Sequence, residues 1–158
     1  LFEGFGKHVV SSATVYEDAP VNPAVWSRVR PTTSANAHLV LKAAQLSAPG
    51  SNATNLALSF RQAFFEQAAD ISDLAILMSL ARDEGLDTAG IVEHIDDGSA
   101  VAALMADYQG AKELGLRGSP SYVLDGGRQT LYGNVGYRVL HANVEELLKN
   151  PRDEASWC

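Results

Sequence analysis

The feature that most constrains this chain is a proline placed between the end of a helix and the start of a strand. Residues 115–126 read Gly-Leu-Arg-Gly-Ser-Pro-Ser-Tyr-Val-Leu-Asp-Gly, so Pro120 leads directly into an apolar run from Tyr122. Proline has no N–H for a strand ladder, but it is tolerated at the first residue of a strand. This placement leaves the N–H and C=O of Ser119 free to pair with an extended peptide or a thiol-bearing ligand. Only about one X–Pro bond in twenty is cis, so residue statistics alone favour an ordinary trans bond.

A hairpin and a last helix are predicted after the proline. The glycines Gly126 and Gly127 reverse the chain between strands predicted over residues 122–124 and 128–132. The apolar spacing of residues 136–148 then predicts a helix, which Pro151 would end.

The rest of the chain is predicted to be mostly helical. Apolar spacing, N-cap residues and glycine stops predict helices over residues 35–47, 52–69, 72–84, 87–98 and 100–114. The second of these should bury Leu56, Phe60, Ala63 and Phe64. The third, residues 72–84, is apolar nearly all round and should be the most buried. The β-branched residues within 8–16 predict a strand.

The proline stretch resembles a loop of a known family. Residues 107–123, with Leu-Gly-Leu at 114–116 and Gly-Ser-Pro-Ser at 118–121, are similar to the cis-proline loop of DsbA-like thioredoxin-fold proteins. In that family a helix ending in Leu-Gly-Val is followed by Gly-x-Pro-Thr and a strand. The resemblance continues to the last helix and extends back to residues 30–44, which look like the start of the family's helical insertion. It covers most of residues 26–148.

The resemblance implies an α/β, thioredoxin-like fold with a helical insertion and a thiol–disulfide oxidoreductase type of function. Residues 1–30 and 116–150 would be a remnant of the thioredoxin-like core, 31–115 the helical insertion domain, and 151–158 a C-terminal tail. The Ser119–Pro120 bond is then expected to be cis, and its loop to bind the substrate backbone. The substrate-binding residues implied are Gly118, Ser119, Pro120 and Ser121.

The family's nucleophile is a cysteine at the start of the first helix of a β-α-β unit, and this sequence has no residue at that place. Its single cysteine is Cys158, so no C-x-x-C motif is present. We therefore expect a chain that lacks the N-terminal part of the thioredoxin core and is inactive by itself. About one further β-α unit is expected before Leu1. An open reading frame that starts at or just before Leu1 would instead indicate a degenerate binding module.

Other residues are candidates of lower standing. Cys158 could act as a resolving or exchange thiol, although an exposed tail thiol without a role is the simpler interpretation. His38, Tyr132 and Asn134 could line the substrate groove. His38 is more simply a partly buried, hydrogen-bonded side chain, and Asn134 is more simply the N-cap of the last helix.

A second branch of the same superfamily offers an alternative function. In the kappa-class glutathione transferases and 2-hydroxychromene-2-carboxylate isomerases, a serine replaces the first cysteine, and a Gly-x-Asp-Arg motif holds glutathione. Residues 132–138 here read Tyr-Gly-Asn-Val-Gly-Tyr-Arg, so the aspartate is missing. No cofactor is expected in the first interpretation, and glutathione would be bound only in this alternative. A non-catalytic thioredoxin-like binding module is a third interpretation.

Composition limits the partners. With 46% apolar and 20% charged residues and a net charge of −7, the chain resembles a soluble globule and lacks the basic face of a nucleic-acid binder. No apolar run approaches the ~20 residues of a membrane span, and the four histidines are scattered without metal-ligand spacing. The expected partners are protein thiols or disulfides, or a small thiol ligand, and an exposed sheet edge could pair with a second copy. The cytoplasm is favoured as the location, but the chain begins at Leu rather than Met, so the lack of a signal-like segment carries little weight.

Overall fold

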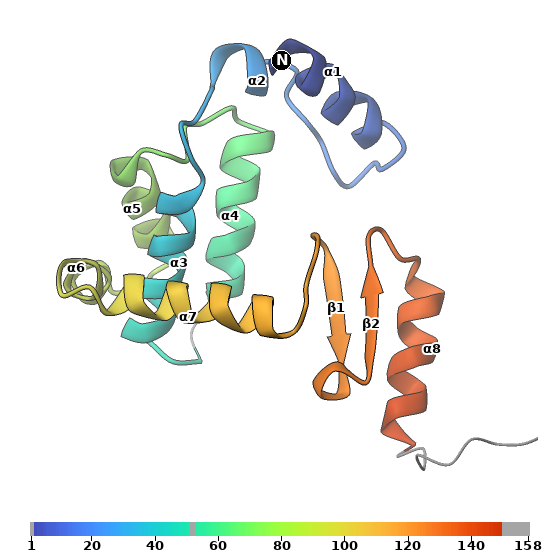
Figure 1. Cartoon of the computed structure of the whole chain (residues 1–158). Helices are drawn as coiled ribbons and strands as arrows, with labels where there is room; N and C mark the ends of the chain where they lie inside the picture. Colours follow the sequence, from blue (N-terminus) through green and yellow to red (C-terminus); the bar gives the residue numbers. More distant parts are fainter. Residues whose placement is uncertain (1, 51–52, 150–158) are drawn as a thin grey trace, which may run out of the picture. The chain divides into compact units, whose positions relative to one another are not determined.

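The computed structural model describes residues 2–50 and 53–149, with the backbone alone at residues 2 and 3. The chain divides into two compact units, Leu1–Asp107 and Tyr108–Cys158, and each is described by itself. The first unit contains α1 (Phe2–Ala13), α2 (Val25–Arg28), α3 (Ala35–Ser47), α4 (Ala53–Phe65), α5 (Leu74–Asp83) and α6 (Thr88–Asp96) (Figure 1). Helix α7 (Ser99–Glu113) crosses the boundary, and the second unit holds β1 (Ser121–Leu124), the 3₁₀ turn η1 (Asp125–Gly127), β2 (Gln129–Tyr132) and α8 (Tyr137–Leu148).

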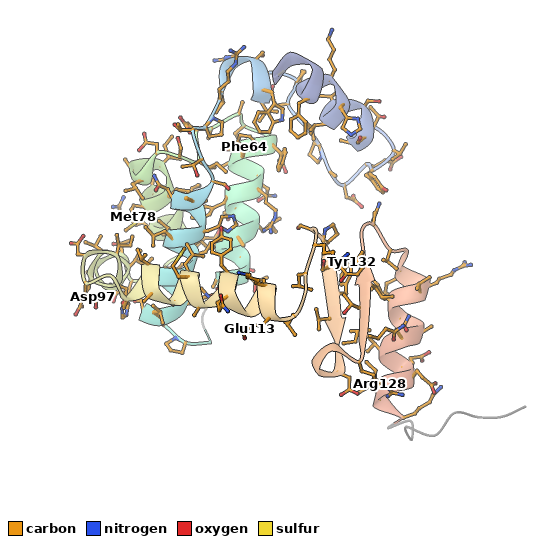
Figure 2. The ribbon with its side chains drawn as sticks, viewed as in Figure 1. Phe64, Met78, Asp97, Glu113, Arg128 and Tyr132 are labelled. Atoms are coloured by element: carbon orange, nitrogen blue, oxygen red, sulfur yellow. The ribbon has the colours of Figure 1, made fainter. Side chains whose placement is uncertain are left out.

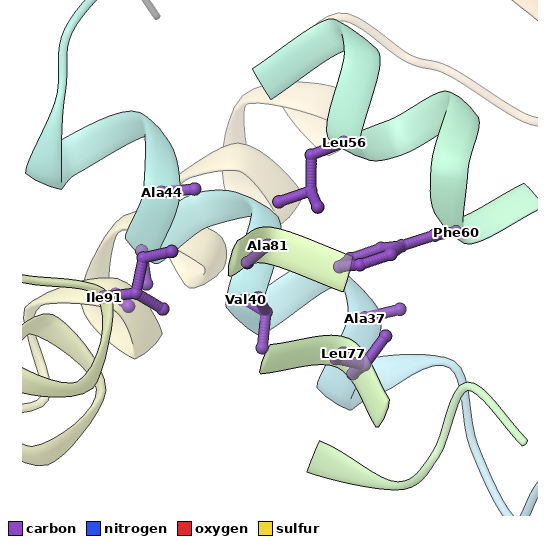
Figure 3. Packing of buried hydrophobic residues seen from close by; sticks show 10 residues of the cluster. Ala37, Val40, Ala44, Leu56, Phe60, Leu77, Ala81 and Ile91 are labelled. Atoms are coloured by element: carbon purple, nitrogen blue, oxygen red, sulfur yellow. The ribbon is translucent and has the colours of Figure 1, made fainter. Parts of the chain in front are cut away.

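Helix α3 is the centre of the first unit. It packs against α4, α5 and α6, and it buries small side chains that allow these helices to approach closely. Figure 3 shows the side chains of the other helices pointing toward this one. The buried cluster consists of Ala37, Val40, Ala43, Ala44, Leu56, Phe60, Leu77, Ala81, Ile91 and Ala100.

The predicted buried face of the second long helix is confirmed. All four residues, Leu56, Phe60, Ala63 and Phe64, are buried on α4. The helix predicted over 35–47 has the bounds of α3, and the other helices differ by a few residues at their ends.

The prediction that residues 72–84 form the most buried helix is wrong. In α5 only Leu77 and Ala81 are buried, and Leu74 is 42% exposed. Helix α3 buries four residues because it is surrounded by neighbours on more than one side. An apolar composition therefore did not decide which helix takes the central place.

The strand predicted over residues 8–16 is also wrong, because most of this stretch belongs to α1. Phe5, Val9 and Ala13 recur at helical spacing, and this pattern prevails over the β preference of the valines. The ring of Phe5 meets Trp26 of α2 edge-on at 5.1 Å, and Gly6 is buried directly against Trp26. The contact fixes α1 against α2.

An aromatic chain continues from α2 to the core. The centroid of Trp26 lies 5.2 Å from that of Phe64, which in turn lies 4.9 Å from that of Phe65. Both pairs are edge-to-face, the geometry that aromatic rings prefer. Beside them Val25 is fully buried, and Asn22 bonds the backbone of α4's last residue. The short helix α2 is thus held onto the end of α4.

The second unit is a hairpin followed by a helix. Strands β1 and β2 pair antiparallel, with Ser121 opposite Tyr132 and Leu124 opposite Gln129. Positive φ angles at Asp125, Gly126 and Gly127 turn the chain between them. Where about three strands were expected, the described residues contain only these two. Among residues 108–149 no side chain is fully buried, and both faces of the sheet remain accessible in part.

Candidate functional site

The loop before β1 is fixed at both sides of Pro120. The Ser119–Pro120 peptide bond is cis, the geometry that the family resemblance implies. The C=O of Pro120 accepts a hydrogen bond from the N–H of Gly133 at 3.0 Å, and the hydroxyl of Ser121 donates to the C=O of Gly118. These contacts join the proline loop to the residue that follows β2 and hold the loop at the start of the hairpin.

Ser119 is exposed and, among the described residues, has unpaired backbone groups. Within the part of the chain that the structure describes, neither its backbone N–H nor its C=O takes part in a hydrogen bond. Its neighbours Gly118 and Pro120 are exposed as well. A donor and an acceptor that face solvent beside a strand are suited to pairing with one residue of an extended chain.

Two of the predicted groove residues lie at the same end of the hairpin. Tyr132 is opposite Ser121 in the strand register and is 51% exposed, and it is labelled in Figure 2. Asn134 is exposed and follows Gly133, whose positive φ of 76° ends β2. The hairpin therefore brings Ser119, Ser121, Tyr132 and Asn134 to one edge of the second unit.

The expectation that Asn134 is the N-cap of the last helix is wrong. Helix α8 begins at Tyr137, and its N-cap is Gly136, with extended backbone at φ −60° and ψ 144°. The sequence predicts the start of this helix at residue 136, and α8 begins one residue later, so Asn134 lies two residues before the N-cap.

His38 belongs to the other unit. It is an exposed residue of α3, and it lines a small cavity of about 130 Å³ beside Phe60 and Phe64 of α4. Its expected partly buried position is therefore replaced by an exposed one, because the buried face of α3 is formed by Ala37 and Val40 on either side.

Cys158 lies outside the described residues. Within residues 2–50 and 53–149 no group of three or more His, Cys, Asp or Glu side chains could hold a metal ion. No helix in that part of the chain is both long and apolar enough to cross a membrane. What the described site offers is therefore backbone hydrogen-bonding groups and the side chains around them.

The comparison with family models identifies the family to which the chain belongs. Residues 22–145 match the family model of the DSBA-like thioredoxin domain, well over half of the chain. The chain belongs to the DSBA-like thioredoxin family. No curated protein matches the sequence.

Membership in the DSBA-like family confirms the resemblance and the α/β thioredoxin-like fold class expected from the sequence. The match includes the proline loop, the hairpin and most of α8, and it begins just before α2. It also places the chain in a superfamily of thiol–disulfide oxidoreductase type. The domain boundaries and the binding roles of the individual residues remain predictions.

One cavity was not foreseen from the sequence. It has a volume of about 600 Å³ and is lined by residues of α1, the segment after it, and α4, all within the first unit. The strand predicted over 8–16 concealed it, because a strand would turn His8 and Val9 to opposite faces, and likewise Ser12 and Ala13, whereas all four line the cavity from one side of α1. The helical spacing of Phe5, Val9 and Ala13 was the signal that could have revealed it.

Proposed function

We propose that this chain provides the substrate-binding loop of a DsbA-like thiol–disulfide oxidoreductase, and that Ser119 pairs with the backbone of an extended protein substrate near its thiol or disulfide. The observation that carries the proposal is the family match, which runs through residues 118–121 and the whole hairpin. The unengaged N–H and C=O of Ser119 and the exposure of the loop support it.

The proposal concerns binding, because the described residues include no cysteine. Gly118, Ser119, Pro120 and Ser121 would form the contact surface, with Tyr132 and Asn134 at its side. Glutathione is the alternative ligand, bound as a small extended thiol peptide at the same edge. The glutathione-binding motif's aspartate has no counterpart in residues 132–138, and this makes us favour the protein substrate.

Titration of the ¹⁵N-labelled chain tests this proposal. The probe is an unstructured eight-residue peptide with one central cysteine, alkylated so that it cannot exchange with Cys158. The amide signals of Ser119 and Ser121 should shift with saturation, while those of Gly126 and Gly127, at the other end of β1, should not. Shifts confined to other regions, or none at all, would refute the loop as the binding element.

A matched pair of glycine variants sharpens the test. A Cβ atom at Gly118 would meet no atom within 4 Å, and neither would one at Gly136. Neither glycine has a positive φ, so Gly118→Val and Gly136→Val should both fold. Only the first adds bulk next to Ser119, and it should weaken peptide binding at least fivefold. Equal affinities in the two variants would contradict the proposal, and preferential saturation of the loop by reduced glutathione would favour the alternative.

A further inference from the structure

The cavity between α1 and α4 has the size and walls of a small-molecule site. Its volume of about 600 Å³ lies within the range of ligand pockets. Apolar side chains form much of its lining, with Phe5 and Val9 from α1 and Leu58 and Phe65 from α4. Leu58 and Phe5 are each about half exposed, so part of this apolar surface is open to solvent. Trp26 of α2 contacts both Phe5 of α1 and Phe64 of α4, and so connects the two walls.

The charged groups around the cavity are mostly acidic. Asp18 and Glu66 both line it, and within the described residues neither carboxylate takes part in an ion pair. One cation, Arg61, lines it too, and its guanidinium donates to the C=O of Ala57 at 2.8 Å. His8, the other titratable lining residue, is exposed, and the two carboxylates outnumber the one guanidinium. The lining therefore carries a net negative charge.

Two further features favour a positively charged occupant. Phe5 and Phe65 contribute aromatic rings to the lining, and the faces of such rings attract ammonium groups. The chain as a whole has a net charge of −7, which draws cations toward it. We infer that this cavity binds a small molecule with an apolar body and a single ammonium group. An apolar anion, held by Arg61, is the competing occupant.

Three probes of equal chain length separate these occupants. Octyltrimethylammonium, octanol and octanoate share the apolar tail and differ in charge, and each is used below its micelle-forming concentration. Calorimetric titration of the full chain should give the tightest binding for the ammonium compound and at least tenfold weaker binding for octanoate. Octanoate binding as tight as the ammonium compound, or no binding of any probe, would overturn the inference.

Variants locate the binding. Ala19 lines the cavity and is exposed, so Ala19→Trp should fold normally while filling the space. It should abolish binding of all three probes; undiminished ammonium binding would place the site elsewhere and refute the inference. The double variant Asp18→Asn/Glu66→Gln should weaken binding of the ammonium compound at least threefold and leave the affinity for octanol unchanged.

A charge-matched control removes the effect of net charge. Glu93 and Asp96 are exposed residues of α6 that do not line the cavity. Glu93→Gln/Asp96→Asn changes the net charge by the same amount and should leave ammonium binding unaltered. If this control weakens binding as much as the cavity variant, the selectivity comes from the overall charge, and the assigned site is wrong. The cavity lies in the first unit and contains no residue of the proline loop. The inference that it binds an ammonium compound can therefore be refuted independently of the proposed function.

Discussion

At the scale of single residues, burial separates two leucines on one helix. Leu56 is fully buried in the cluster around α3, whereas Leu58 of the same helix is 54% exposed. Leu56→Ala should lower the free energy of unfolding by about 2–5 kcal/mol, because it removes buried methyl groups and leaves a cavity. Leu58→Ala is the control and should cost less than about 1 kcal/mol. Urea unfolding followed by circular dichroism measures both, and equal losses would contradict the assigned core.

A second residue-scale prediction concerns the turn before α5. The hydroxyl of Ser72 donates to the carboxylate of Asp70 at 2.6 Å, and the N–H of Ser72 donates to it at 2.9 Å. These two bonds, the hydroxyl first, hold the pKa of Asp70 below its ordinary value. Ser72→Ala removes the hydroxyl, so the pKa of Asp70 should rise toward the ordinary value of about 3.9. An NMR titration of the Asp70 carboxyl checks the direction.

The sign of the pH effect follows from this lowered pKa. The charged form of Asp70 is favoured in the folded state, so its stabilising contribution is present above the ordinary aspartate pKa and is lost as the pH falls through the lowered value. The turn also carries a contact to α3, because the C=O of Ser72 accepts from the side chain of Asn36 at 2.7 Å. If the Asp70 titration is the same in Ser72→Ala as in the unchanged chain, the hydroxyl bond does not form in solution.

Residue patterns predicted burial well where one helix face meets several neighbours. All four residues assigned to the buried face of α4 are buried. On α3 helical spacing would also join Leu39, Ala43 and Leu46 in one apolar stripe, but Leu46 is 36% exposed. Close packing by α4, α5 and α6 instead selects the small residues Ala37 and Ala44 for the interior. Which face of α3 turns inward depends on the helices that pack against it. The sequence of α3 alone does not specify that face.

At the scale of elements, the contact between α3 and α6 depends on a glycine. A Cβ atom at Gly90 of α6 would lie 2.3 Å from the hydroxyl oxygen of Ser47 on α3 and 2.8 Å from a carboxylate oxygen of Asp87. Gly90→Ala should therefore destabilise the chain by about 1–3 kcal/mol through overpacking. This direction is opposite to the gain of up to about 1 kcal/mol that alanine usually brings to a helix interior. Thermal or urea unfolding measures the change.

A double-mutant cycle identifies the cause of this loss. Ser47→Ala removes the oxygen atom that would clash, so Gly90→Ala should cost much less in the Ser47→Ala background. Recovery should be incomplete, because the Asp87 carboxylate must still move. Gly110→Ala in α7 is the control, since a Cβ there meets no atom within 4 Å and no loss is expected. An undiminished cost in the double variant would rule out Ser47 as the obstacle.

The element that sequence reasoning misassigned is α1. The three valines and one threonine within residues 9–15 favour a strand, and strand preference depends strongly on context. Here the context is the packing of α1 on α2, where the ring of Phe5 contacts that of Trp26 edge-to-face. The cavity beside α1 could be recognised only once this helix was placed. Local propensity alone predicted a strand where the chain forms a helix. It thereby concealed the cavity that we assign to a second ligand.

At the scale of the whole molecule, the fold class and the proline loop could be predicted, because both depend on local motifs. The glycine-ended helix, the proline before an apolar run and the paired glycines determine the loop and the hairpin from within about twenty residues. The relation of His38 to this loop could not be predicted in the same way. His38 lies in the first unit and Ser119 in the second, so their relation depends on contacts between distant parts of the chain.

The last prediction follows from the number of thiols. The 158-residue chain contains one cysteine, Cys158, and a single thiol cannot alternate between a dithiol and an intramolecular disulfide. The polypeptide alone should therefore not accelerate the reduction of a disulfide-containing model protein by dithiothreitol, even if the loop around Ser119 binds that protein. The assay compares the initial rate with and without the chain and repeats it with Cys158→Ser. Acceleration that survives Cys158→Ser would show that the activity does not need a thiol of this chain. Acceleration lost in Cys158→Ser would make Cys158 the reacting group and move the active site to the C-terminus.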